Sequence, residues 1–174
     1  MHVSQPERRT ERLLLRPIRA EDFSGLLDLY STEATARFIG GTCNDEDAWR
    51  RMAAMIGHVA LRGYGVWGLE ELASGTLIGY CGPWYPHGWP EPEIAWSLRA
   101  GFHGRGYATE AAREALRFVY GELGWTTAIS CIATENQASI RVAERLGARL
   151  ERDTVNRGWP ASIYRHRPPA AHAR

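Results

Sequence analysis

The stretch GFHGRGYATEA, residues 101–111, places three glycines directly before a run of helix-forming residues. Glycines at such a position leave the first backbone N–H groups of the helix uncovered by side chains. Together with the helix dipole, uncovered donors of this kind form a binding site for an anion. The segment therefore predicts an anion-binding loop, followed by a helix that reaches about Glu122 with an alanine-rich buried stripe.

The length and composition indicate one globular domain. A chain of 174 residues with 44% hydrophobic residues can bury a sizeable core. We expect a single domain over residues 1–174, with its core at about 10–166 and a disordered tail at 167–174. The net charge of +1 provides no basic surplus for a nucleic-acid or membrane partner. Because no segment resembles a signal peptide or a membrane span, we expect a cytoplasmic protein.

The cysteines and histidines do not predict a metal site. The three cysteines (Cys43, Cys81 and Cys131) are scattered, odd in number and contain no CxxC pair. We interpret them as free thiols of a reducing compartment. The six histidines show no spacing typical of metal ligands, so we expect no metal.

Hydrophobic periodicity predicts a mixed α/β domain with a mostly antiparallel sheet of about six to seven strands flanked by helices. The expected order is β-α-α-β-β-β-α-β-α-β-β. Strands are expected at residues 13–15, 65–72, 75–82, 93–98, 127–133, 148–155 and 161–166, and the first, second and last helices at about 22–30, 45–61 and 136–147. The strand at 93–98 should direct Ile94, Trp96 and Leu98 to one face and the residues between them to the other.

Two details of the first helices can be predicted. Asp22 or a neighbour should cap the first helix. The second helix should end at Gly63 and bury a stripe of Trp49, Met52, Ala53, Ile56 and Ala60. The acidic residues 45–47 at its start either stabilise the helix by interacting with the positive end of its dipole or attract a cation, and we prefer the first interpretation.

The residues of the glycine loop narrow the choice of anion. GRGYAT is no dinucleotide fingerprint, because GxGxxG requires a glycine where Thr109 stands. A phosphate loop of the GxxxxGK[ST] type needs a lysine, and the chain contains none. A nucleotide-binding protein of another fold is therefore a weak alternative. The loop suits a pyrophosphate that is held in place while the chemistry happens at the other end of the ligand.

Residues 103–108, HGRGYA, resemble the acetyl-CoA pyrophosphate loop of GNAT-family N-acetyltransferases, whose pattern is Q/R-x-x-G-x-G/A. Gly106 and Ala108 match this pattern, and His103 replaces the usual Gln or Arg. The continuation YATEA resembles the RimJ/RimL-like branch of the family. Three further stretches, TERLLLRPIRAEDF, PEIAWSL and ENQASIRVAERLGA, resemble its opening strand and helix, its fourth strand and its second cofactor segment, although Ala148 stands where Phe is usual.

The resemblance implies that acetyl-CoA is the cosubstrate and lies in a V-shaped opening between the strands at 93–98 and 127–133. Its pantetheine arm would pair with the first of these strands, and its pyrophosphate would reach the glycine loop. The residues expected to contact it are Ile94, Trp96, Ser97, Leu98, His103, Gly104, Arg105, Gly106, Tyr107, Ala108, Thr109, Asn136 and Ser139.

The same resemblance implies the catalytic groups. Glu93 would act as general base, through a water, with a pKa raised by apolar neighbours. Ser139 would assist departure of the thiolate. Many relatives place a tyrosine acid one turn further along this helix, where this chain has Ala143, and Tyr164 is a weaker alternative.

The expected acceptor is a primary amine, either a protein N-terminus or a small molecule, which reacts by direct transfer in a ternary complex. Trp84, Tyr85 and Trp89, with His87, lie in a proline-rich segment that would form a wall or lid of the acceptor pocket. Aromatic packing over the sheet edge is the alternative role for these side chains. The alternative function is a non-catalytic acyl-CoA-binding or sensing module of the same fold. The sequence leaves open whether the protein is a monomer or a homodimer.

Overall fold

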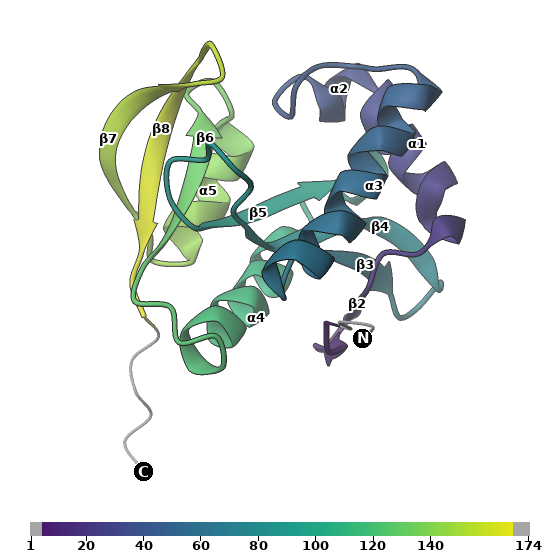
Figure 1. Cartoon of the computed structure of the whole chain (residues 1–174), viewed down its shortest axis with the longest axis horizontal. Coiled ribbons are helices and arrows are strands. Elements are labelled where there is room, and N and C mark those ends of the chain that lie inside the picture. The colour runs from purple at the N-terminus through teal and green to yellow at the C-terminus, as the bar shows by residue number, and fades with distance from the viewer. Residues whose placement is uncertain (1–4, 169–174) are drawn as a thin grey trace.

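The computed structural model describes residues 5–168, which form one twisted sheet with helices on both faces (Figure 1). Within these residues the sheet has eight strands, one more than the upper expectation. The strands are β1 (Arg8–Arg9), β2 (Leu13–Arg16), β3 (Trp67–Glu71), β4 (Thr76–Trp84), β5 (Glu93–Leu98), β6 (Ala128–Ala133), β7 (Arg149–Asn156) and β8 (Trp159–His166). The predicted tail at 167–174 lies mostly outside the described residues.

The helices are α1 (Phe23–Ser31), α2 (Glu33–Ala36), α3 (Asp45–Arg62), α4 (Tyr107–Gly121) and α5 (Gln137–Arg145), with short 3₁₀ turns at Ala20–Asp22 and Ala100–Phe102. The predicted order of elements is confirmed. The short elements β1 and α2 were not predicted, because two to four residues carry no periodic signal.

The strand order β1-β2-β3-β4-β5-β6-β8-β7 is antiparallel throughout, except for the parallel pair β5 and β6. β4 and β5 are fully paired from Gly79–Leu98 to Trp84–Glu93. β6 is fully paired with β8. Each half of the sheet is therefore continuous, and the junction between the halves is the single parallel pair.

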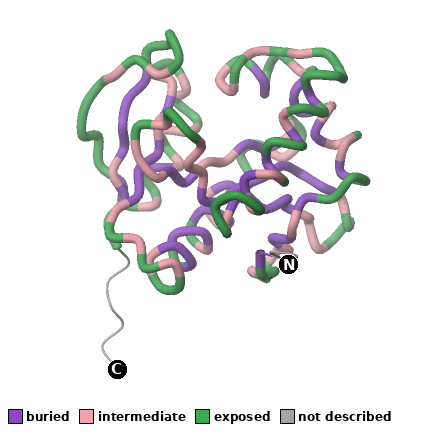
Figure 2. Tube along the Cα trace, in the orientation of Figure 1, coloured by how far each residue is buried: buried purple, intermediate pink, exposed green. Residues whose placement is uncertain are grey.

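Two apolar clusters cover the two faces of the first half of the sheet. One cluster joins α4 to Ile94, Leu98 and the partly buried Trp96 of β5. The other joins α1 and α3 to Tyr80 of β4 and the partly buried Ala95 of β5. The predicted alternation along β5 is confirmed, and Figure 2 shows the buried trace running along these strands between exposed outer segments.

The predicted buried stripe of α3 is wrong in register. The buried residues are Ala48, Met52, Met55 and His58, whereas Trp49 is 50% and Ile56 42% exposed. Both stripes have helical spacing, so periodicity alone could not choose between them. The end of the helix at Gly63, with φ of 79°, is confirmed.

Asp22 directly precedes α1, but its side chain does not cap that helix. Its two carboxylate oxygens accept hydrogen bonds from the Arg16 guanidinium, each at 2.8 Å, and one also accepts the backbone N–H of Arg19 at 2.8 Å. The buried guanidinium of Arg16 needs a charged partner, and this need directs the Asp22 side chain away from the helix.

Candidate functional site

β5 and β6 diverge directly beyond their first residues. Their register contains the single pair Glu93–Ile129, supported by the Ile129 N–H, which donates to the Pro92 carbonyl at 3.0 Å. Figure 1 shows the two arrows leaving this common base in different directions. We call the space between the diverging strands the β5–β6 opening.

The Ser130 side chain replaces the next backbone hydrogen bond between β5 and β6. In a regular parallel ladder the N–H of Cys131 would donate to the Ile94 carbonyl. That carbonyl instead accepts from the Ser130 hydroxyl at 2.7 Å. Because this hydroxyl proton is committed, Ser130 Oγ accepts from His166 Nε2 at 2.9 Å, which fixes His166 as the Nε2–H tautomer. The buried Ser130 thus ends the ladder and opens the sheet.

The β5 edge of the opening presents backbone groups. Alternate residues of a strand direct their N–H and C=O to the same side, so Trp96 and Leu98 share the direction of Ile94, toward β6. The Leu98 carbonyl is occupied by His103 Nε2 at 2.8 Å. The backbone of Trp96 faces no strand partner in the described register. This edge can therefore pair with an extended ligand, as an added strand would.

Glu93 lies at the base of the opening, on the face covered by α1 and α3. It is 6% exposed. Burial raises the pKa of Glu93 to about 7, although hydrogen bonds from the Trp89 indole and the Cys131 backbone N–H oppose the rise. The Cys131 N–H, released from the ladder, points at Glu93 Oε1 at 3.4 Å. A carboxyl group in this state can exchange a proton near neutral pH.

The predicted aromatic wall begins at Trp84, the last residue of β4, and continues into residues 85–92, here called the Trp89 loop. Trp89 donates its indole N–H to Glu93 Oε2. The loop contains a turn closed by the Trp89 N–H to the Pro86 carbonyl at 3.1 Å. At its far end, Glu91 forms a two-point ion pair with Arg165 of β8 at 2.9 and 3.0 Å. The loop is thus fixed over Glu93 rather than free.

The first two residues of the wall contact α3. The Trp84 ring stacks on the His58 imidazole, with centroids 4.4 Å apart. The Tyr85 N–H donates to His58 Nε2 at 3.1 Å. Trp84 pairs with Glu93 across the β4–β5 ladder and Trp89 contacts it through the indole N–H, so the structure brings these two beside Glu93. The Tyr85 ring instead lies under the guanidinium of Arg62, 5.0 Å away, and His87 is exposed at the turn.

Ser139 approaches the opening from the opposite face. The Trp96 indole N–H donates to Ser139 Oγ at 3.2 Å. Asn136 caps α5, because its side-chain oxygen accepts the Ser139 N–H at 3.1 Å. The Ser139 hydroxyl accepts from Trp96 and keeps its own proton available for another acceptor. Ala143 and Tyr164 are buried in the cluster beneath α5, so Tyr164 is placed as a packing residue.

The glycine loop, residues 103–106, has the backbone form that its sequence predicts. Gly104 and Gly106 take φ of 74° and 82°, and α4 begins at Tyr107 without a side-chain cap. The four loop residues are exposed, and no side chain caps the first N–H groups of α4. Arg105 is exposed and lies over the Phe102 ring, and its carbonyl accepts from Arg12 at 2.8 Å.

Arg12 also holds the first turn of α4. Its backbone and side-chain N–H groups donate to Glu110 at 2.8 and 2.7 Å, and the Thr10 hydroxyl adds a third bond at 2.6 Å. Burial opposes ionisation of Glu110, but these donors outweigh it and lower its pKa. A carboxylate that would repel an anion at the helix start is thereby neutralised.

A hollow of about 620 Å³ adjoins the glycine loop. Gly104, Gly106 and Thr109 are among the residues that line it, and the Thr109 hydroxyl is buried without a hydrogen-bond partner within residues 5–168. Arginines outnumber carboxylates around it, with Arg9, Arg12, Arg113, Arg117 and Arg145 against Glu11, Glu110 and Glu114. The size and charge of this hollow suit a phosphorylated ligand.

Several predicted cofactor residues can contribute only backbone groups. Ile94, Leu98 and Ala108 are buried, and the Ile94 carbonyl is already bonded to Ser130. Ser97 is also buried, and its backbone faces Tyr80 of β4, away from the β5–β6 opening. Tyr107 is buried too, and its hydroxyl donates to Glu71. The contacts predicted for these residues and for the rest of the site stay predictions.

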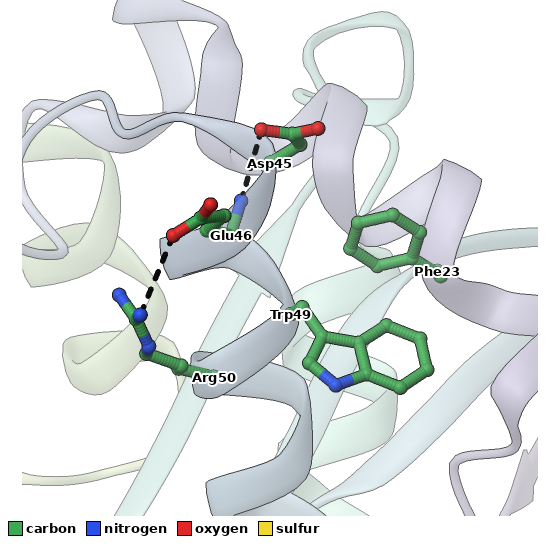
Figure 3. A pocket seen from close by; sticks show the side chains of 5 residues that line it. All are labelled: Phe23, Asp45, Glu46, Trp49 and Arg50. Carbon is green, nitrogen blue, oxygen red and sulfur yellow. Dashed lines mark hydrogen bonds and ion pairs between the residues drawn. The ribbon is translucent and has the colours of Figure 1, made fainter.

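A second hollow, of about 330 Å³, lies between the starts of α1 and α3 (Figure 3). Phe23 and Trp49 meet edge to face on one side, with centroids 5.2 Å apart, and Glu46 pairs with Arg50 on the other. Asp45 completes the lining. Asn44 caps α3 and Asp47 also pairs with Arg50, so the acidic helix start is satisfied locally. None of the predicted site residues lines this hollow.

The thiols are neither paired in disulfides nor part of a metal site within the described residues. Cys43, Cys81 and Cys131 are free thiols. Burial raises the pKa of the Cys131 thiol to about 11, so this group beside Glu93 stays protonated. Within residues 5–168 no His, Cys, Asp and Glu cluster could hold a metal ion, and no helix combines the length and apolarity that crossing a membrane requires. The cytoplasmic location stays a prediction.

Three site residues were missed by sequence reasoning: Ser130, His166 and His58. All three are buried polar residues, and Ser130 and His58 stand in otherwise apolar stretches, whereas His166 stands between Arg165 and Arg167. That contrast was the available signal, because a buried polar group must have a partner. The sequence does not show which partner it is.

Comparisons with known proteins agree with the geometry. A family model described as "Acetyltransferase (GNAT) domain" matches residues 12–149. The uncharacterised protein YkkB of Bacillus subtilis (strain 168) is 33% identical over 107 residues, which span 59% of this chain and only 62% of that relative. The crystal structure of an acetyltransferase from Agrobacterium tumefaciens str. C58 is 29% identical with a TM-score of 0.87, covering 96% of this chain and 97% of that one. A ribosomal-protein-S5-alanine acetyltransferase from Vibrio fischeri shares the fold at 12% identity and a TM-score of 0.76, covering 95% and 98%.

Proposed function

This chain belongs to the GNAT acetyltransferase family, and from that premise we propose that it transfers an acetyl group from acetyl-CoA to a primary amine by direct attack in a ternary complex. One observation carries the proposal. The β5–β6 opening has a buried carboxyl group with a pKa of about 7 at its base, and its β5 strand leads directly to the glycine loop.

The residues present fit acetyl-CoA. The unpaired backbone of Trp96 suits the amide groups of the pantetheine arm, and the uncapped N–H groups at the start of α4 suit the pyrophosphate. The arginine-rich hollow beside Thr109 suits the phosphorylated adenosine end. When bound, acetyl-CoA supplies the activated thioester.

Two side chains on opposite faces of the opening divide the proton chemistry. Glu93, ionised in about half of the molecules near its pKa of about 7, takes the proton from the incoming ammonium or from the amine after attack. Ser139, oriented by Trp96, donates a hydrogen bond from its hydroxyl to the departing thiolate sulfur and keeps its proton. The protonated thiol of Cys131 is a poor nucleophile, which favours direct transfer over an acyl-cysteine intermediate.

The acceptor would enter from the face of α1 and α3, between those helices and the Trp89 loop. The YATEA segment resembles the RimJ/RimL-like branch, and a ribosomal-protein acetyltransferase shares the fold. We therefore place protein N-termini first among candidate acceptors and small-molecule amines second.

The test begins with calorimetric titration of the purified protein with acetyl-CoA and with CoA. Thiol release is then followed with a panel of peptide N-termini and small amines. Glu93→Gln should lower kcat/KM by about 100-fold or more at neutral pH and leave the affinity for CoA unchanged. Binding of acetyl-CoA without turnover on any amine would support the acyl-CoA-binding module instead. Failure to bind either ligand would overturn the proposal.

A further inference from the structure

His58 of α3 makes hydrogen bonds from both ring nitrogens, and the two partners define its protonation. Nδ1 lies 2.8 Å from the carbonyl oxygen of Tyr64, which can only accept. Nε2 lies 3.1 Å from the backbone N–H of Tyr85, which can only donate. Nδ1 must therefore carry the proton and Nε2 must not, so His58 is the neutral Nδ1–H tautomer.

The surroundings leave this ring little freedom. His58 is 6% exposed. Its imidazole stacks on Trp84 with centroids 4.4 Å apart and meets the Tyr64 ring edge to face at 5.6 Å. A protonated ring would place a donor against the Tyr85 N–H in this buried position, which costs both the hydrogen bond and the desolvation of a charge.

The bond to Tyr85 fixes the start of the Trp89 loop. The turn that follows is closed by the Trp89 N–H to the Pro86 carbonyl, and Gly88 takes the positive φ of 82° that this turn requires. Trp89 then reaches Glu93 Oε2 with its indole N–H. A continuous path of short-range contacts thus connects the core of α3 to the carboxyl group at the base of the opening.

We propose that His58, held as the neutral Nδ1–H tautomer, is a positioning residue that fixes the start of the Trp89 loop so that Trp89 stays hydrogen-bonded to Glu93. The effect of His58 on catalysis rests on the proposed function. The hydrogen bonds that connect His58 to Glu93 do not depend on it. His58 does not touch the proposed substrates, and it acts on Glu93 only through the loop.

Two substitutions of His58 distinguish the hydrogen bond made by Nδ1 from the one made by Nε2. The amide of Asn ends at the level of Nδ1, whereas the longer Gln side chain places an acceptor oxygen at the level of Nε2. His58→Gln can therefore keep the bond to the Tyr85 N–H, and His58→Asn cannot. Both variants lose the stacking on Trp84 equally, so each controls for the packing lost in the other.

The readout is the titration midpoint of the Glu93 carboxyl group, measured by ¹³C NMR. The Trp89 N–H stabilises the ionised form of Glu93, so its loss raises the pKa. Trp89→Phe and His58→Asn should each move the midpoint upward by about one pH unit. His58→Gln should titrate as the wild type, and the double variant His58→Asn/Trp89→Phe should move no further than Trp89→Phe alone. Equal midpoints in His58→Asn and the wild type would overturn the proposal, as would additive shifts.

A measurement on the wild type keeps the proposal testable if a variant does not fold. The ¹⁵N shifts of the His58 imidazole should show a protonated Nδ1 and an unprotonated Nε2 at neutral pH, and the opposite tautomer or a charged ring would contradict it. Neither measurement requires turnover. Absence of acetyl transfer would thus count against the proposed function, whereas an unmoved midpoint counts against the role of His58.

Discussion

Ser130 Oγ lies 2.7 Å from the carbonyl oxygen of Ile94, at the position where β5 and β6 would otherwise continue their backbone ladder. The same hydroxyl accepts the Nε2–H of His166. One buried side chain therefore joins the strands at their base, ends their pairing and releases the Cys131 N–H toward Glu93. The opening that defines the candidate site depends on this substitution of a side-chain bond for a backbone bond.

Ser130→Ala should destabilise the fold. It removes the donor to Ile94 and leaves the His166 N–H without an acceptor in a buried position, so we expect a loss of about 2 kcal/mol in urea unfolding. Ser162→Ala is the control, because that hydroxyl donates to the exposed Asp153 side chain and should cost less than about 1 kcal/mol. Equal stability of Ser130→Ala and the wild type would contradict this account.

Glu93 should make the fold less stable as the pH rises. The pKa of Glu93 is about 7 in the folded protein and 4.5 in the unfolded chain. The folded protein is therefore most stable, as far as Glu93 is concerned, below pH 4.5, and it loses this stability as the pH rises from 4.5 to about 7. The difference corresponds to about 3 kcal/mol. Glu93→Gln has no carboxyl group to ionise, so its unfolding free energy should lack this pH dependence. Between pH 4 and pH 8 the wild type should therefore lose about 3 kcal/mol of stability relative to the variant. A difference that does not change with pH would show that Glu93 titrates normally.

A negative charge in the glycine loop should prevent CoA binding. Asn and Asp both tolerate the left-handed conformation of Gly106, and they have nearly the same shape. Gly106→Asp places a carboxylate where the pyrophosphate is expected, so calorimetry should show affinity for CoA at least about tenfold lower than that of Gly106→Asn. Equal affinities in the two variants would remove the loop from the binding site.

Arg12 should support the loop by neutralising Glu110. Arg12→Met leaves that carboxylate without its ionic partner and frees the Arg105 carbonyl, so CoA affinity should fall about tenfold. Adding Glu110→Gln to this variant removes the unpaired charge and should restore part of the affinity. If Arg12 and Glu110 acted independently, the changes in CoA binding free energy of the two single variants would add up to that of the double variant. Calorimetry on the wild type, both single variants and the double variant tests this.

Ser139→Ala should lower kcat without weakening acetyl-CoA binding. The variant keeps the backbone N–H that Asn136 caps and removes only the hydroxyl that faces the opening. We expect kcat to fall at least about tenfold with KM for acetyl-CoA unchanged. Trp96→Phe, which keeps the ring but loses the N–H to Ser139, should show a smaller decrease in kcat. A change in KM alone would assign Ser139 to binding.

Local patterns predicted most of the elements. Period-2 and period-3.6 spacing located seven of the eight strands and four of the five helices within residues 5–168, and the glycines marked the turns and the start of α4. These signals are reliable because backbone conformation depends largely on neighbours within a few residues. The same reasoning was wrong for α3, where two apolar stripes compete, and for Asp22, whose carboxylate is taken by the buried Arg16.

The sequence by itself determined the order of the elements, the form of the glycine loop and the presence of a carboxylate at the start of β5. Only the tertiary structure decided that Glu93 is buried under Trp89, that Ser130 opens the sheet and that His58 fixes the loop. These relationships join residues that are far apart along the chain, such as Ser130 and Ile94, 36 positions apart, and His58 and Tyr85, 27 positions apart. A side chain selects a distant partner only when the folded chain has removed water from both, and no local pattern contains that information.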